Sequence, residues 1–375
     1  MNGFPTRAII DLNAIRSNMA TLVQRSHGTA VMAVVKANGY GHGAVPCALA
    51  ALAGGATWVG VAQVTEALRV RAAIGGGRML SWIYTPETAF AQAIEAQIDL
   101  GVSAPWALEA IAAAARHTAS RARIHLKTDT GMGRAGVPPA SWIRTVDMAL
   151  AAEDALELVG CWSHFACADQ PGHPSIQAQK DAFAWAVETA EARGACFEVR
   201  HLANSAALLT DAGANWDLIR PGLAMYGLSP IPDLASAADL GLRPAMRLES
   251  TLTLVKNVSA GQGVSYGLTY RTSRDTMLAI VGAGYGDGVP RSASGAGPVW
   301  VAGRRGRVAG RLCMDQFVSE LGPGAACQAG DRVVLFGTGD DGEPTAEDWA
   351  RAAGTIAYEI VTGIPAHVPR EYVGG

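Results

Sequence analysis

The sequence has little charge and no patterned cysteines. Charged residues make up 17% of the 375 residues, and the formal net charge is −3. A near-neutral chain without a basic face is not expected to bind nucleic acid. The six cysteines are scattered without a paired framework, and Asp11 interrupts the N-terminal segment before a signal-peptide core could form. We therefore expect a cytoplasmic protein without disulfides.

One uncharged stretch, residues 43–65, is long enough to span a membrane. It contains Pro46, the pair Gly54-Gly55 and many alanines, which contribute little apolar transfer energy. We expect it to form a helix at Ala44–Ala53, a glycine turn and a strand at Thr57–Ala62, and we expect no membrane association.

Strand-like and helix-like patterns alternate through the first two thirds of the chain. Eight strands with intervening helices predict a (β/α)8 TIM-like barrel rather than a doubly wound sheet. After about residue 240 the sequence becomes rich in strands and glycine, with one helix at Ala346–Ala353 that Thr345 caps. We predict an α/β protein with a barrel domain at 1–239 and a mostly β domain at 240–375. The expected barrel strands are Val31–Lys36, Trp58–Ala62, Met79–Tyr84, Leu100–Ser103, Arg123–Lys127, Leu156–His164, Phe197–Leu202 and Trp216–Arg220.

Reactive side chains stand at the ends of several of these strands. Barrel enzymes build their sites at the carboxyl ends of the strands, so these side chains should converge on one rim. Burial lowers the pKa of a lysine, and a lysine of lowered pKa can form a Schiff base with an aldehyde cofactor or a carbonyl substrate. Taken alone, Lys36 also fits a lysine that extends into solvent. The strand-end residues are Lys36, Lys127, His164, Asn204, Ser205 and Arg220.

The loops after the seventh and eighth strands commonly bind phosphate in barrels. Asn204-Ser205 offers a hydroxyl and backbone N–H groups, although an ordinary helix cap explains the same pair. Gly222 allows close approach of the backbone. A Schiff-base lysine and a phosphate site at opposite ends of one pocket predict pyridoxal 5′-phosphate (PLP) as the cofactor.

Two other cofactor classes fit less well. Cys161, His164, Cys167 and His173 have a spacing like that of zinc ligands, but no second ligand pair follows. The glycine-rich segments lack the dinucleotide fingerprint. We expect no metal, and we interpret the tryptophans and methionines as core residues.

The ordered set of motifs resembles the alanine racemase family nearly end to end. The resemblance implies PLP-dependent exchange of L-alanine and D-alanine by a homodimer whose active sites are shared between subunits. Gly286 and His367 depart from the alanine and arginine usual in that family. The motifs are 33–43, 127–134, 163–166, 204–205, 220–222, 264–267, 284–288, 313–316 and 357–359.

The resemblance also implies a role for each site residue. Lys36 carries PLP as a Schiff base and acts on the D-enantiomer, while Tyr266 acts on the L-enantiomer. Arg220 faces the pyridine nitrogen, and Lys127 is carbamylated and orients Arg134. The remaining implied cofactor contacts are Tyr40, His164, Asn204, Ser205, Gly222 and Tyr358, and the implied substrate contacts are Arg134, Met314, Asp315 and Tyr285.

Other functions remain open at this point. A racemase of another small amino acid such as serine, a related PLP decarboxylase, a non-catalytic PLP carrier and a cofactor-free lyase all fit part of the pattern. Arg220 argues against the decarboxylase, because an arginine disfavours protonation of the ring nitrogen. The sequence does not distinguish supply of D-alanine for peptidoglycan from alanine catabolism.

Overall fold

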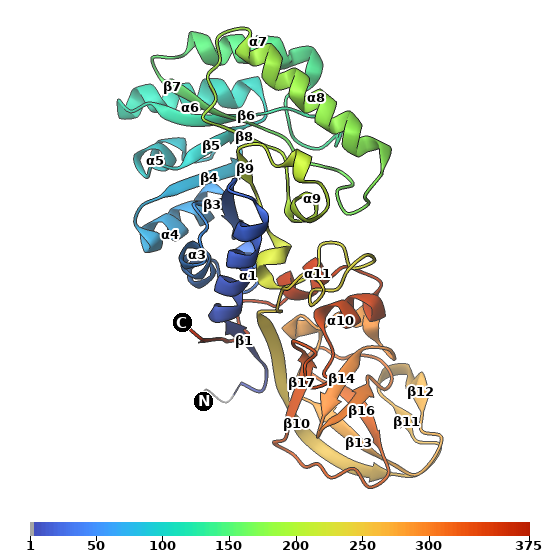
Figure 1. The fold of residues 1–375 in the computed structure, drawn as a ribbon. Helices are drawn as coiled ribbons and strands as arrows, with labels where there is room; N and C mark the ends of the chain where they lie inside the picture. The colour runs from blue at the N-terminus through green and yellow to red at the C-terminus, as the bar shows by residue number, and fades with distance from the viewer. Residues whose placement is uncertain (1–3) are drawn as a thin grey trace.

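Eight parallel strands form a barrel in the first two thirds of the computed structural model, which describes residues 4–375 (Figure 1). The order is β8-β7-β6-β5-β4-β3-β2-β9, and an isolated bridge between Asn204 and Arg220 joins the two ends. The predicted barrel is confirmed. Its strands are β2 (Ala30–Val34), β3 (Trp58–Gln63), β4 (Arg78–Ile83), β5 (Asp99–Val102), β6 (Ala122–Lys127), β7 (Leu156–Trp162), β8 (Val199–His201) and β9 (Leu218–Ile219).

Amphipathic helices cover the outside of the barrel. In α6 (Pro105–Thr118), proline occupies the first turn, and the buried residues Leu108, Ile111, Ala112 and Ala115 follow the three-to-four-residue spacing of one helix face. The other barrel helices are α1 (Leu12–Arg25), α3 (Ala44–Ala53), α4 (Val64–Ile74), α5 (Phe90–Glu95), α7 (Pro139–Ala151), α8 (Pro174–Glu191) and α9 (Ser205–Thr210). The uncharged stretch 43–65 forms α3 and β3, and no helix among residues 4–375 is long and apolar enough to cross a bilayer.

The C-terminal part is mostly β, as predicted. Its long strand β10 (Met246–Val258) pairs with β17 along one half and with β13 along the other. The strands β14 (Pro298–Val301) and β15 (Arg304–Arg307) form a hairpin, in which Ala302 and Gly303 turn the chain with φ of 49° and 74°. Thr345 caps α10 (Ala346–Ala353) through a reciprocal bond pair with Asp348. The other elements are β11 (Gly263–Val264), β12 (Tyr270–Arg271), β13 (Thr276–Val281), β14 (Pro298–Val301), β15 (Arg304–Arg307), β16 (Phe317–Gly322), β17 (Arg332–Phe336), α11 (Ala357–Thr362) and β18 (Arg370–Val373).

The first strand of the chain lies outside the barrel. β1 (Arg7–Asp11) pairs antiparallel with β10 and parallel with β18, at the junction of the two parts in Figure 1. The prediction placed residues 1–239 in the barrel, but residues 7–11 belong to the C-terminal sheet. The buried carboxylate of Glu249 on β10 forms ion pairs with Arg7, Arg247 and Arg332, which ties β1 to that sheet.

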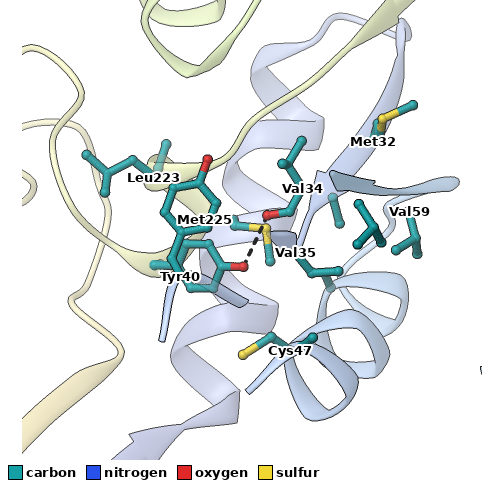
Figure 2. Close-up of a cluster of buried hydrophobic side chains, with 14 of the residues drawn as sticks. Met32, Val34, Val35, Tyr40, Cys47, Val59, Leu223 and Met225 are labelled. Carbon is teal, nitrogen blue, oxygen red and sulfur yellow. Dashed lines mark hydrogen bonds between the residues drawn. The ribbon is translucent and has the colours of Figure 1, made fainter. Parts of the chain in front are cut away.

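A left-handed turn carries Lys36. β2 ends at Val34, and Ala37 to Tyr40 in α2 (Lys36–Tyr40) all have φ between 51° and 62°. Non-glycine residues pay about 1–2 kcal/mol each for this conformation. Tertiary contacts hold it: Asn38 donates its N–H to Glu66 at 2.6 Å, and Tyr226 donates to the Val34 carbonyl at 3.1 Å. Figure 2 shows the apolar side chains packed around Val34 and Tyr40.

The turn also depends on Gly41, which has φ +82° and lies against α11. A Cβ there would come within 2.2 Å of the Val361 carbonyl oxygen. We expect Gly41→Ala to lower the free energy of unfolding by about 1–2 kcal/mol from backbone strain and about 1–3 kcal/mol from the clash. The matched control is Gly28→Ala, where φ is +91° and nothing lies within 4 Å. Urea denaturation of both variants measures the difference, and equal losses would contradict the clash.

Candidate functional site

A cavity of about 590 Å³ opens at the carboxyl ends of the barrel strands. Lys36 reaches it from the turn after β2, Lys127 from the end of β6, His164 from beyond β7 and Arg220 from beyond β9. The parallel strands bring these positions together because their carboxyl ends share one rim. Ten of the predicted site residues line the cavity: Lys36, Tyr40, Lys127, Arg134, His164, Asn204, Ser205, Arg220, Gly222 and Tyr358.

The lining contains four cationic side chains and, within the described chain, no carboxylate. Burial lowers the pKa of Lys36, and Arg134 and Arg220 lower it further. Burial, followed by Arg220 and Arg134, lowers the pKa of Lys127 to about 8. Both amines therefore lose their protons more readily than a solvated lysine, and the cavity favours an anionic ligand.

Arg220 is held rigidly at the wall of the cavity. Its Nη2 donates to the Ser163 and Leu202 carbonyls at 2.7 and 3.1 Å and contacts His164 Nδ1 at 3.2 Å, while Nη1 contacts His201 Nδ1 at 3.0 Å. Burial and the neighbouring cations hold the pKa of His164 well below its usual range, so this histidine is neutral and accepts the bond. Burial lowers the pKa of Arg220, but a guanidinium stays protonated at neutral pH.

Hydroxyl groups gather at another part of the same lining. A Cβ on Gly222 would lie 2.3 Å from the hydroxyl oxygen of Tyr40, so only glycine fits beside this phenol. Ser205 Oγ accepts the Gly222 N–H at 2.9 Å. Burial raises the pKa of Tyr40, and it raises that of Tyr358 to about 12. Both phenols remain protonated donors, as a phosphate group requires.

These residues fit PLP by their chemistry. An amine of lowered pKa can hold an aldehyde, and the fixed guanidinium of Arg220 can donate to a ring nitrogen. The neutral phenols and the Ser205 hydroxyl can donate to a phosphate.

Trp162 lines the cavity, and the interpretation of the tryptophans as core residues misses this. Its indole stacks on His201, with centroids 5.4 Å apart and an interplanar angle of 11°. Lys127 Nζ and Arg220 Cζ lie 4.6 and 5.1 Å from the ring centroid. The only signal in the sequence is its position two residues before His164, which puts it on the same side of an extended chain.

Four predicted residues lie elsewhere. Tyr266, Met314 and Asp315 line a second cavity of about 570 Å³ in the C-terminal domain. Tyr266 is 70% exposed and Met314 is 55% exposed. Tyr285 lines a third cavity, of about 440 Å³. A single chain therefore gathers the predicted cofactor contacts around Lys36 but does not bring Tyr266 to the same cavity.

Known proteins resemble the chain along its whole length. The family model described as "Alanine racemase, N-terminal domain" matches residues 10–230, and "Alanine racemase, C-terminal domain" matches 245–372. A Streptomyces coelicolor protein named alanine racemase is 55% identical over 98% of this chain and 95% of its own length. The crystal structure of alanine racemase from D-cycloserine producing Streptomyces lavendulae superposes with a TM-score of 0.98 at 54% identity, covering 100% of this chain and 98% of that one. The biosynthetic alanine racemase from Pseudomonas aeruginosa gives 0.88 at 37% identity, covering 98% and 99%. The chain belongs to the alanine racemase family.

Proposed function

We propose that this protein is an isomerase that interconverts L-alanine and D-alanine with PLP, using Lys36 and Tyr266 as its two proton carriers. The observation that carries the proposal is the cationic rim cavity, which unites an amine of lowered pKa with Arg220 and a set of neutral hydroxyl donors. Full-length relatives named alanine racemase support the reaction and the substrate.

Each part of the cavity has a task in holding the cofactor. Lys36 is the amine that would bind the aldehyde, and Arg220 would donate to the ring nitrogen. Tyr40, Ser205 and Tyr358 would donate to the phosphate, with Asn204 and Gly222 shaping the adjoining backbone. When bound, PLP supplies an electron sink for the carbanion left when the Cα proton departs.

Arg220 determines how strong that sink is. A guanidinium keeps its own protons, so it donates a hydrogen bond to the ring nitrogen without protonating it. With Arg220 as its partner, a bound ring would stay unprotonated and would withdraw electrons less strongly than a protonated pyridine does. A weak sink favours rapid return of the proton to Cα, as racemisation requires, over decarboxylation or transamination.

Exchange of two mirror-image substrates needs a proton carrier on each face of the reacting carbon. Lys36 can serve one face, because burial and the neighbouring cations lower its pKa. Tyr266 is the proposed carrier on the other face, and it lies on the C-terminal domain in a separate cavity. The separation supports a head-to-tail homodimer in which each cavity receives Tyr266, Met314 and Asp315 from the partner chain.

The substrate carboxylate would bind at the cationic side of the cavity. Arg134 supplies a guanidinium there, and Met314 would supply its backbone N–H. We assign Tyr285 to the approach to the site. We also propose that the C-terminal domain begins near residue 240, since the two family matches end at 230 and begin at 245.

We further propose that the protein works in the cytoplasm and supplies D-alanine for peptidoglycan. All six cysteines, each within the described residues, are free thiols, which suits a reducing compartment. The solved relative from Pseudomonas aeruginosa is described as biosynthetic, which favours supply over breakdown.

The reaction and the shared site are tested together. The protein is incubated with L-alanine and PLP in heavy water, and the product is analysed by chiral chromatography. We expect racemic alanine that carries deuterium at Cα. Lys36→Ala and Tyr266→Phe should each lower kcat by at least about 10²-fold, because each removes an acid–base group. Mixed inactive subunits should recover about a quarter of the wild-type activity, since one site of each hybrid dimer is intact.

Two controls make this result decisive. Subunit exchange is verified with a tag on one variant, and each variant is also mixed with itself. Release of carbon dioxide without D-alanine would refute the racemase, whereas racemisation by the wild type without recovery in verified hybrids would refute only the shared site.

Lys127 is the residue that we propose to be carbamylated. Carbamylation needs a neutral amine, and the pKa of Lys127 is lowered to about 8. A carbamate would also replace one positive charge by a negative charge between Lys36, Arg134 and Arg220. It would then orient Arg134 by a charge-assisted hydrogen bond.

Protein equilibrated with ¹³C-bicarbonate should show one carbamate carbon by NMR, and acid should remove the signal. Lys127→Ala should lack the signal and lose about 10²-fold in kcat/KM through misplacement of Arg134. Lys256→Ala, at an exposed lysine, is the matched control and should keep both the signal and the activity. A signal that survives in Lys127→Ala, or no signal in the wild type, would contradict the modification.

A further inference from the structure

A chain of buried hydrogen bonds runs from Arg220 through the inside of the barrel. Arg220 Nη1 lies 3.0 Å from His201 Nδ1, His201 Nε2 lies 2.9 Å from His125 Nδ1, and His125 Nε2 lies 3.2 Å from Asp99 Oδ2. Each of the four residues is 5% exposed or less. The chain crosses from the end of β9 to β8, β6 and β5. His125, His201 and Asp99 do not belong to the cavity lining.

Only one arrangement of protons satisfies this chain. Arg220 has donors alone, so His201 Nδ1 must accept and its proton must be on Nε2. His201 then donates to His125 Nδ1, which places the second proton on His125 Nε2, and this nitrogen donates to the carboxylate. Every bond therefore points the same way, from the guanidinium to Asp99. Burial and the charge of Arg220 also hold the pKa of His201 well below its usual range, in keeping with a neutral imidazole.

The far end of the chain is anchored. Asp99 forms an ion pair with Arg123 at 3.1 Å and lies 3.7 Å from Arg78. Two aromatic side chains restrain the imidazoles. Trp162 stacks on His201, and the Trp58 and His125 rings are nearly perpendicular, with centroids 5.6 Å apart. The imidazoles therefore have little freedom to turn away from one another.

We propose that His201, His125 and Asp99 are positioning residues that fix the plane of the Arg220 guanidinium at the cavity wall. They act through a one-way chain of hydrogen bonds that ends on a carboxylate. The hydrogen bonds of Arg220 within the described chain use its two terminal nitrogens, so Nε is left for a ligand. The contact between Nε and the ring nitrogen rests on the proposed function. The restraint of Arg220 does not depend on that function.

The first test reads the protons directly. In ¹⁵N-histidine-labelled protein without cofactor, we expect His201 as a neutral Nε2–H tautomer throughout pH 6–8. We expect His125 to carry its proton on Nε2 and to accept on Nδ1. An Nδ1–H tautomer or an imidazolium at either residue would overturn the proposal. This measurement stands whether or not the protein racemises alanine.

The second test cuts the chain at its middle. His125→Leu should speed hydrogen exchange of the Arg220 guanidinium about tenfold through loss of one ordering interaction, and should shift the absorption band of bound PLP. It should lower kcat with little change in KM for alanine, because the cavity lining is untouched. His125→Asn keeps an acceptor for His201 without reaching Asp99. It should therefore restore part of the wild-type protection of the Arg220 guanidinium against exchange.

Trp58→Phe is the control for packing, since Trp58 touches His125 without joining the chain. Thermal unfolding of all variants separates stability from positioning. If the hydrogen exchange of the Arg220 guanidinium and the PLP band in His125→Leu match those in Trp58→Phe, the proposal is overturned. Loss of protection at Arg220 in a protein whose wild type does not racemise alanine would uphold the positioning role and refute the proposed function.

Discussion

The concentration of positive charge at one rim of the barrel is the constraint on which the site depends. Lys36, Lys127, Arg134 and Arg220 share a cavity whose described lining carries no carboxylate. Burial and the repulsion from neighbouring cations together lower the pKa of both lysines. An anion that enters the cavity relieves this repulsion. Phosphate, the substrate carboxylate and a carbamate are all anions. The proposed ligands and the proposed modification would therefore each reduce the repulsion between these cations.

The barrel makes such a concentration possible. A buried parallel sheet closes through β8 and β9, and buried apolar residues of its strands and of the surrounding helices pack against one another. The carboxyl ends of all the strands then face one opening, whatever the spacing of the residues in sequence. The rim loops are shaped by contacts with distant segments. The left-handed turn after β2 depends on Glu66 from α4 and on Gly41 against α11, so the position of Lys36 is coupled to both parts of the chain.

The strands of the barrel could be predicted closely because the sequence of a buried parallel strand is a short run of apolar residues. β1 was not among the predicted strands, since its partners lie more than 200 residues away and its five residues carry no long pattern. The rim residues followed from their places after strands. Tyr266 and Met314 followed from the family resemblance alone, because nothing local links the C-terminal domain to the barrel mouth. Trp162 was missed because composition does not tell which side of a strand faces a cavity.

The remote position of Asp99 has a chemical consequence for a racemase. A carboxylate next to the ring nitrogen would favour its protonation and strengthen the electron sink. Three hydrogen bonds separate the Asp99 charge from Arg220, so its negative potential stabilises the guanidinium while no Asp or Glu of the described chain lines the cavity. Two neutral imidazoles carry the polarisation across the barrel, because each accepts on Nδ1 and donates from Nε2. The barrel interior can thus support a buried cation and still leave the reacting carbon with a weak sink, which suits a carbanion that must regain its proton quickly.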